Sequence, residues 1–549
     1  MEKKGKQGNH HNKPMRILAV TGVLLQLVAI LTSIPLTNMI GDAGNGFLAA
    51  AYGVYLVLLV VSTYVVPNVI ADFMRTRITK GQYKNAVAVL RTVTFYAAIS
   101  GLLAGAIAYF GADFLMGNCL LEPMSALILQ ALSPTLVIMA FVHVLRGYFQ
   151  GIGTMMPTMI SQIIERIVTS VSALAATFVL AQYGSKVGSL LGNASFLSSY
   201  GAMGIACGMG IGAIISLLFL LVVWGSYHKS FQHQVEKDVV STHTSYAQLM
   251  RLFFVAMLPL VVGTLVAQIE MLLDQILYHY SCVAQGMNDL KAVQFGVYVG
   301  KYKVLTGIPI LLGSLICVTV APMLRSVMGK VTIKVVKDRI TSLLHVTMLL
   351  VIPLAVGLMV LAEPIVTLLF QGEIELAAQM LRMGSVSVIL WTLCIFSTGV
   401  LQGLHKEKIV LWNTLVGLAL HSFVLVILFS QLPVLIYAVV IADMLFALIL
   451  YALNQWFISK TINYKQELIQ TFLFPAGASI VMGLMMFLLH KGLIAPLGNL
   501  FATLIAMVVG FIVYLVLITL LHGFEENEII LIPGGSVLII VAKWLHVLR

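Results

Sequence analysis

Charged side chains inside long apolar stretches are the residues of this chain that could do chemistry. An ionisable group at the centre of a bilayer costs about 2.5–3.5 kcal/mol on insertion scales, so each one is a candidate functional residue. Arginine binds phosphate through its planar fork and lysine acts as a compact point charge, whereas the acids would balance these cations or couple to an ion. The candidate phosphate-binding cations are Lys303, Arg166, Arg146 and Lys301, and the acids are Glu165, Glu270 and Asp274.

The spacing of these charges also allows a purely structural interpretation. Glu270 and Asp274 are four residues apart, which places both on one face of a helix. Arg146 with Glu165, and Asp274 with Lys303, could form ion pairs between helices, and Arg146 could extend to lipid headgroups. Both interpretations stay open from the sequence. Two further charged candidates lie in apolar segments: Asp443 and Arg382.

The segments that must position these charges are apolar along almost the whole chain. The 549 residues are 60% hydrophobic and only 10% charged, and the mean hydropathy is +1.01. A helix needs about 20 mostly apolar residues to cross a bilayer. The pattern predicts an all-α polytopic membrane protein with about fourteen transmembrane helices, the first two at 17–37 and 47–72 and the last two at 468–489 and 500–521.

Composition and missing motifs exclude several classes of function. The net charge of +11 is explained by membrane topology and attraction to anionic headgroups, so no nucleic-acid partner is expected. The sequence has no Walker A motif, HExxH or readable Ser/His/Asp arrangement. We therefore expect no catalytic residue, metal site or cofactor, and a transporter rather than an enzyme, driven by an ion gradient of unknown ion, the membrane potential or substrate flux.

The basic residues predict the orientation of the chain. Most of the 32 Lys and Arg residues fall on one side if the N-terminus is cytoplasmic, and the richest segments are the N-terminal tail and residues 75–84 and 325–339. Cytoplasmic loops of membrane proteins carry such an excess. Both termini are expected in the cytoplasm, in a multi-pass protein of a bacterial plasma membrane.

A weak internal repeat predicts two halves. Phe149-Gln150-Gly151 recurs as Leu401-Gln402-Gly403, and both tripeptides follow an apolar helix. Two six-helix lobes in parallel orientation are the plan of many alternating-access transporters. The predicted organisation is a cytoplasmic tail (1–16), an N-lobe (17–224), a cytoplasmic linker (225–247), a C-lobe (248–457), a C-terminal helix pair (458–521) and a cytoplasmic tail with an interfacial helix (522–549).

Several motifs resemble a known group of transporters. The sequence is similar to stage V sporulation protein B and the lipid II flippases, in the polysaccharide-transport branch of the multidrug/oligosaccharidyl-lipid/polysaccharide exporter superfamily. The segments that carry the resemblance are Ile34–Thr37, Ile40–Asp42, Gly44–Gly46, Arg146–Gly151, Met156–Thr158, Ser161–Glu165 and Leu401–Lys406.

This resemblance implies an activity and places one site residue. Members of the group flip a polyprenyl-pyrophosphate-linked saccharide, such as the peptidoglycan precursor lipid II, to the outer leaflet, in cell-wall biogenesis and the maintenance of cell shape. Their two lobes enclose a cationic cavity, and the last helix pair forms a groove for the lipid tail. Lys303, 19 residues before Pro322, occupies the place of one cavity cation. The expected partners are this lipid and the surrounding membrane, for a monomer that works with the cell-wall synthesis machinery.

Two other functions remain open from the sequence. A cation-coupled multidrug antiporter of the same superfamily would use Glu270 and Asp274 for ion coupling. A membrane glycosyltransferase with polyprenyl donors would need an acidic residue in a large external loop, and the first external hairpin offers only Asp42.

Overall fold

A computed structural model describes residues 3–239, 245–328, 331–432 and 435–521, with side chains from residue 21 onward. These ranges contain helices and no strand, which confirms the all-α prediction. Twelve of the helices are long and apolar enough to cross a membrane. The interfacial helix predicted within 522–549 lies outside the described residues.

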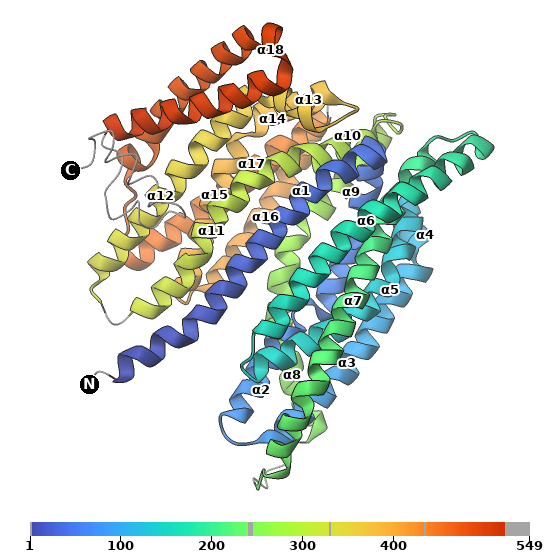
Figure 1. The fold of residues 1–549 in the computed structure, drawn as a ribbon, viewed down its shortest axis with the longest axis vertical. Coiled ribbons are helices and arrows are strands. Elements are labelled where there is room, and N and C mark those ends of the chain that lie inside the picture. Colours follow the sequence, from blue (N-terminus) through green and yellow to red (C-terminus); the bar gives the residue numbers. More distant parts are fainter. Residues whose placement is uncertain (1–2, 240–244, 329–330, 433–434, 522–549) are drawn as a thin grey trace. The chain divides into compact units, whose positions relative to one another are not determined.

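Two of these twelve helical segments contain a sharp turn. The long helix α1 (Lys3–Leu59) changes direction at Gly41, where φ is 72°. Helix α18 (Phe474–Leu520) does so at Gly498, with φ 73°, and folds back on itself (Figure 1). Both turns lie where the sequence predicts the loops of the first and last helix pairs. The total of fourteen spans stays a prediction.

The chain divides into two compact units, Met1–Val299 and Gly300–Arg549. Unit 1 includes three helices that follow the predicted linker. The elements of unit 1 after α1 are η1 (Val60–Tyr64), α2 (Val66–Ile78), α3 (Tyr83–Phe110), α4 (Ala112–Phe114), η2 (Leu115–Cys119), η3 (Pro123–Ser125), α5 (Ala126–Gly151), α6 (Met156–Leu191), α7 (Ser195–Glu236), α8 (Tyr246–Gln268), α9 (Glu270–Ala284) and α10 (Lys291–Val297).

Close packing of α10 on α1 explains why unit 1 extends to Val299. A Cβ atom on Gly296 would lie 1.8 Å from the carbonyl oxygen of Asp42, and one on Gly46 would lie 2.1 Å from that of Ala292. Small residues allow membrane helices to approach each other to this distance. Only glycine fits at these two positions.

A second glycine-lined contact fixes α6, which carries one wall of the candidate site. Helices α6 and α7 run side by side (Figure 1). The contact repeats every four residues of α7: Cβ atoms on Gly204 and Gly208 would lie 2.5 Å from backbone atoms of Thr177 and Ala173. Small residues at this spacing form one face of a helix and bring the two backbones together.

Unit 2 is also built from packed helices, with α12 and α15 lying against α11. Helix α17 packs on α15 and α16, and α18 packs on α12. The elements are η4 (Tyr298–Tyr302, which crosses the boundary between the units), α11 (Lys303–Val327), α12 (Ile333–Val360), α13 (Ala362–Leu369), α14 (Ile374–Gly384), α15 (Val386–Gly403), α16 (Glu407–Gln431), α17 (Leu435–Ile462), η5 (Ile469–Leu473) and α18.

The two matching tripeptides also share their backbone conformation. Helices α5 and α15 end at the glycines of the two matching tripeptides, Gly151 and Gly403. Each helix ends with the same three backbone hydrogen bonds. After α5, the N–H groups of residues 152, 153 and 154 donate to the carbonyls of residues 148, 150 and 149, respectively. After α15, the N–H groups of residues 404, 405 and 406 donate to the carbonyls of residues 400, 402 and 401. The second donor has positive φ in both, 91° at Gly153 and 58° at His405. The two units therefore share a helix end in identical register.

Candidate functional site

Unit 1 contains an open cavity of about 720 Å³. This size is within the range of small-molecule sites, about 300–1,000 Å³. The α6 wall includes the polar side chains of Gln162, Glu165 and Arg166. The wall formed by α1 and η1 is mixed, and we call the part formed by Tyr52, Tyr55 and Tyr64 its aromatic wall.

Arg146 at the cavity edge is held in a network of hydrogen bonds. Its Nη2 donates to Glu165 Oε2 at 2.6 Å and to Ser216 Oγ at 3.2 Å, and its Nε donates to Ser161 Oγ at 3.0 Å. The side chain is 7% exposed. The structure thus contains the Arg146–Glu165 ion pair that the sequence allowed, and these contacts favour a structural role for both residues.

Arg166 differs from Arg146 although it lines the same cavity. Among the residues that the structure describes, no carboxylate pairs with its guanidinium. The adjacent Glu165 is bonded to Arg146 instead. An arginine with its five donors turned to a cavity is suited to bidentate binding of a phosphate group.

The aromatic wall was not singled out by sequence analysis. Tyr52 and Tyr55 are three residues apart on α1, and Tyr64 ends η1. All three line the cavity. The available signal was the pair of tyrosines at i and i+3 in an apolar helix, which places two phenol groups on one face.

Lys303 lies in unit 2, in a group of three residues. Its Nζ donates to Asp443 Oδ1 at 2.6 Å and lies 5.7 Å from the ring centre of Trp391. Trp391 Nε1 also donates to Asp443 Oδ1, at 3.0 Å. Asp443 is 1% exposed and Lys303 is 28% exposed. The cation predicted to bind substrate is therefore paired with an acid that sequence analysis ranked as a further candidate.

Lys301 is fully buried in unit 2. Its Nζ donates to the backbone carbonyls of Gln371 at 2.6 Å and Glu373 at 3.2 Å. These carbonyls belong to the segment between α13 and α14, so the ammonium joins that segment to η4. Its predicted part in substrate binding stays a prediction, and its contacts favour a structural role.

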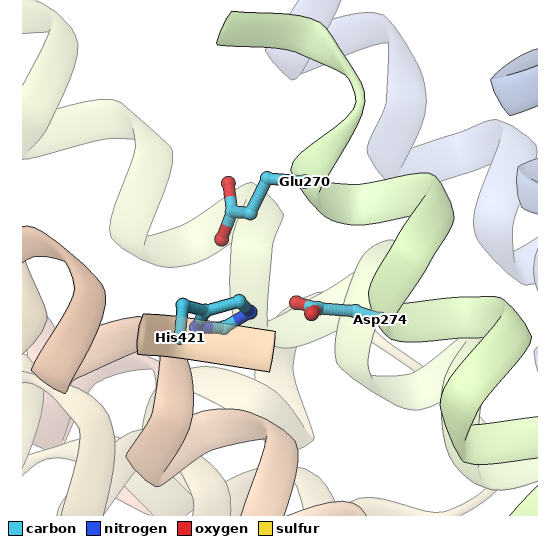
Figure 2. Close-up of side chains that lie close together, drawn as sticks. All are labelled: Glu270, Asp274 and His421. Atoms are coloured by element: carbon cyan, nitrogen blue, oxygen red, sulfur yellow. The ribbon is translucent and has the colours of Figure 1, made fainter. Parts of the chain in front are cut away.

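The two acids of α9 project from the same side of that helix, as their spacing predicted (Figure 2). Glu270 lies in the first turn of α9 and Asp274 follows one turn later, where it is buried. Gln275, the next residue, donates to the carbonyl of Gly46 at 3.2 Å. Whether the acids balance the cations or couple transport to an ion stays a prediction.

A buried acid lies just before the candidate span that begins at Pro123. Glu122 precedes η3, is 5% exposed, and its carboxylate lies 4.0 Å from Lys291 Nζ. Burial raises the pKa of Glu122 to about 7, although Lys291 opposes this rise. Lys291 Nζ also donates to the carbonyl of Leu121. The pair therefore joins the start of α10 to the segment before η3.

Solved structures similar to this chain share its fold. A lipid II flippase MurJ structure in the inward closed conformation matches with TM-score 0.62 and 13% identity, over 92% of this chain and 98% of that one. An inward-facing multidrug resistance MATE family transporter of the MOP superfamily matches with TM-score 0.56 and 12% identity, over 81% and 98%. These likenesses show a fold common to both kinds of protein.

Sequence comparisons point to the same group. Lipid II flippase MurJ of Bacillus subtilis is 22% identical over 74% of this chain and 74% of its own length. Stage V sporulation protein B of the same organism is 20% identical over 76% and 77%. The model of the family described as polysaccharide biosynthesis protein matches residues 14–328, which is more than half of the chain. This multi-pass membrane protein belongs to the polysaccharide biosynthesis protein family.

Proposed function

We propose that this protein is a flippase that moves a polyprenyl-pyrophosphate-linked saccharide of the lipid II type from the inner to the outer leaflet by alternating access. The observation that carries the proposal is Arg166, a cation without an ion pair among the described residues, in a cavity between membrane-spanning helices. A charge in such a place is costly unless a ligand uses it. The family and its relatives supply the class of ligand.

Each unit holds a cation that is a candidate to bind the pyrophosphate, Arg166 in unit 1 and Lys303 in unit 2. Arg166 offers a fork that binds two phosphate oxygens at once. Lys303 is held by Asp443 at 2.6 Å and would exchange that carboxylate for a phosphate when the lipid arrives. This exchange gives the ammonium an anionic partner with and without the lipid, while Asp443 keeps the hydrogen bond from Trp391.

Complementation of a bacterium depleted of its own lipid II flippase tests the proposal. We expect this protein to restore growth and the exposure of lipid II on the cell surface, and Arg166→Gln to abolish both. Arg382→Gln is the matched control, because Arg382 is half exposed and, within the described ranges, pairs only with Glu363 at 2.6 Å. No rescue by wild-type protein that is present in the membrane would refute the lipid II assignment.

A cation-coupled multidrug antiporter is the second candidate, favoured by the two acids on one side of α9 (Figure 2). An antiporter would lower the accumulation of cationic dyes in cells, and Glu270→Gln would abolish this effect. The flippase proposal predicts unchanged dye accumulation together with restored lipid II exposure.

A further inference from the structure

Besides Arg166, the cation suited to a pyrophosphate, aromatic and uncharged polar side chains line the unit 1 cavity. Its α1 and η1 wall presents aromatic rings, and its α6 wall presents the amide of Gln162 four residues before Arg166. Residues at this spacing share one face of a helix. A cavity with an apolar face, uncharged polar groups and, among the described residues, one cation without an ion pair suits an amphiphilic ligand that is larger than a phosphate.

The ring of Tyr52 is an exposed and well-supported surface. Tyr52 is 36% exposed, whereas Tyr55 beneath it is 3% exposed. The two rings stack with centroids 5.8 Å apart and planes 23° from parallel. Tyr64, 46% exposed, lies edge-on to His143, with ring centroids 6.2 Å apart. Packing from behind holds the rings in place and leaves their cavity sides free.

The hydroxyl groups of these three tyrosines have no hydrogen-bond partner among the residues that the structure describes. Several tyrosines elsewhere in the helices do have a partner. Those that donate to a carbonyl or side-chain oxygen include Tyr96, Tyr278, Tyr302, Tyr451 and Tyr514. Gln162 likewise has no partner among the described residues. Because these groups line the cavity and make no hydrogen bond within the described part of the protein, a ligand that enters the cavity can bond to them without breaking an existing hydrogen bond.

We propose that this cavity binds the saccharide of the transported lipid, with a sugar ring stacked on Tyr52 and its hydroxyls bonded to the tyrosine hydroxyls and to Gln162. The inference rests on the proposed function and names the residues that contact the sugar. A sugar ring presents polarised C–H groups on one face, which the negative face of an aromatic ring attracts, and hydroxyls around its edge. A lipid tail would leave the polar groups unpaired, and a pyrophosphate alone would need only Arg166.

The test compares two lipids on purified protein in detergent by native mass spectrometry. One is a polyprenyl-pyrophosphate disaccharide, and the other is the same polyprenyl pyrophosphate without sugar. We expect Tyr52→Leu to weaken binding of the saccharide lipid about tenfold and to leave binding of the sugar-free lipid unchanged. Tyr52→Phe keeps the ring and loses only the hydroxyl, so a loss of about threefold or less is expected.

The other possible results of the binding test contradict either the saccharide assignment alone or the proposed function as well. Equal weakening of both lipids by Tyr52→Leu, or of neither, would overturn the saccharide assignment and leave the proposed function standing. Failure of the wild-type protein to bind either lipid would overturn both. Tyr64→Leu is the second variant, since its ring is the more exposed one and its loss removes less packing; the same lipid-selective loss is expected of it, and its absence would contradict the proposal.

Discussion

Replacement of Glu165 by Gln isolates the buried charge of Arg146. The guanidinium would keep its bonds to Ser161 and Ser216 but lose its only described carboxylate, and arginine cannot give up its proton inside a protein. Breaking a buried ion pair by removing one partner costs about 3–5 kcal/mol. Because Glu165 is 27% exposed, we expect the lower value of about 2–3 kcal/mol after allowance for solvent screening.

Thermal unfolding of the purified protein in detergent measures this loss. With an unfolding entropy of about 2.1 cal/mol/K per residue, 1 kcal/mol shifts the midpoint of a chain of 549 residues by about 1 °C, so the midpoint should fall by roughly 2–3 °C in Glu165→Gln. Arg166→Gln is the matched control on the neighbouring residue, and its midpoint should stay close to that of the wild type. The double variant Arg146→Gln/Glu165→Gln should lose less than the sum of the two single variants. A wild-type midpoint for Glu165→Gln, or strict additivity, would refute this account of the pair.

Three further predictions concern stability. Lys303→Gln should lower the free energy of unfolding by about 3 kcal/mol, because it leaves the carboxylate of Asp443, which is only 1% exposed, without its cation. Asp443→Asn should lower it by only about 1 kcal/mol, and equal losses in unfolding experiments would contradict this order. Gly296→Ala should cost more than about 2 kcal/mol because its Cβ meets the Asp42 carbonyl, whereas Gly263→Ala, in open space, should unfold at or above the wild-type temperature; similar losses would refute the close contact. Burial raises the pKa of Glu122 from 4.5 to about 7, so the folded state binds the carboxyl proton more tightly than the unfolded state does. The free energy of unfolding should therefore fall as the pH rises from 4.5 to about 7. Glu122→Gln should remove this fall, and parallel pH profiles of the variant and the wild type would contradict the assignment.

The fold was largely predictable from the sequence because length and hydropathy determine where helices can cross a membrane. The positions of the turns at Gly41 and Gly498 agree with the loops predicted for the first and last helix pairs. The unit boundary was less predictable. It depends on two glycines, Gly46 and Gly296, that lie 250 residues apart in sequence and permit one helix contact.

The site was predictable in its residue types but only partly in its pairings. Arg146 and Glu165 are 19 residues apart on helices that are consecutive in the chain, so their pairing could be foreseen. The partner of Lys303 is Asp443, 140 residues away, and hydropathy carries no information on such a contact. The tyrosines were missed because an aromatic residue in an apolar helix is most often a packing residue, and only the structure shows that their hydroxyls open to a cavity.

The contact between α10 and α1 has a mechanical consequence. Gly296 meets the backbone of Asp42 with no side chain between them, so neither helix can tilt against the other without a clash. Any bend between α10 and α11 would then fall after Val297, in the π-helical turn Tyr298–Tyr302, a type of turn often found at functional sites. Lys303 is the first residue beyond that turn. A small change in the pitch of these five residues would therefore move the ammonium of the lysine that we propose to bind the substrate.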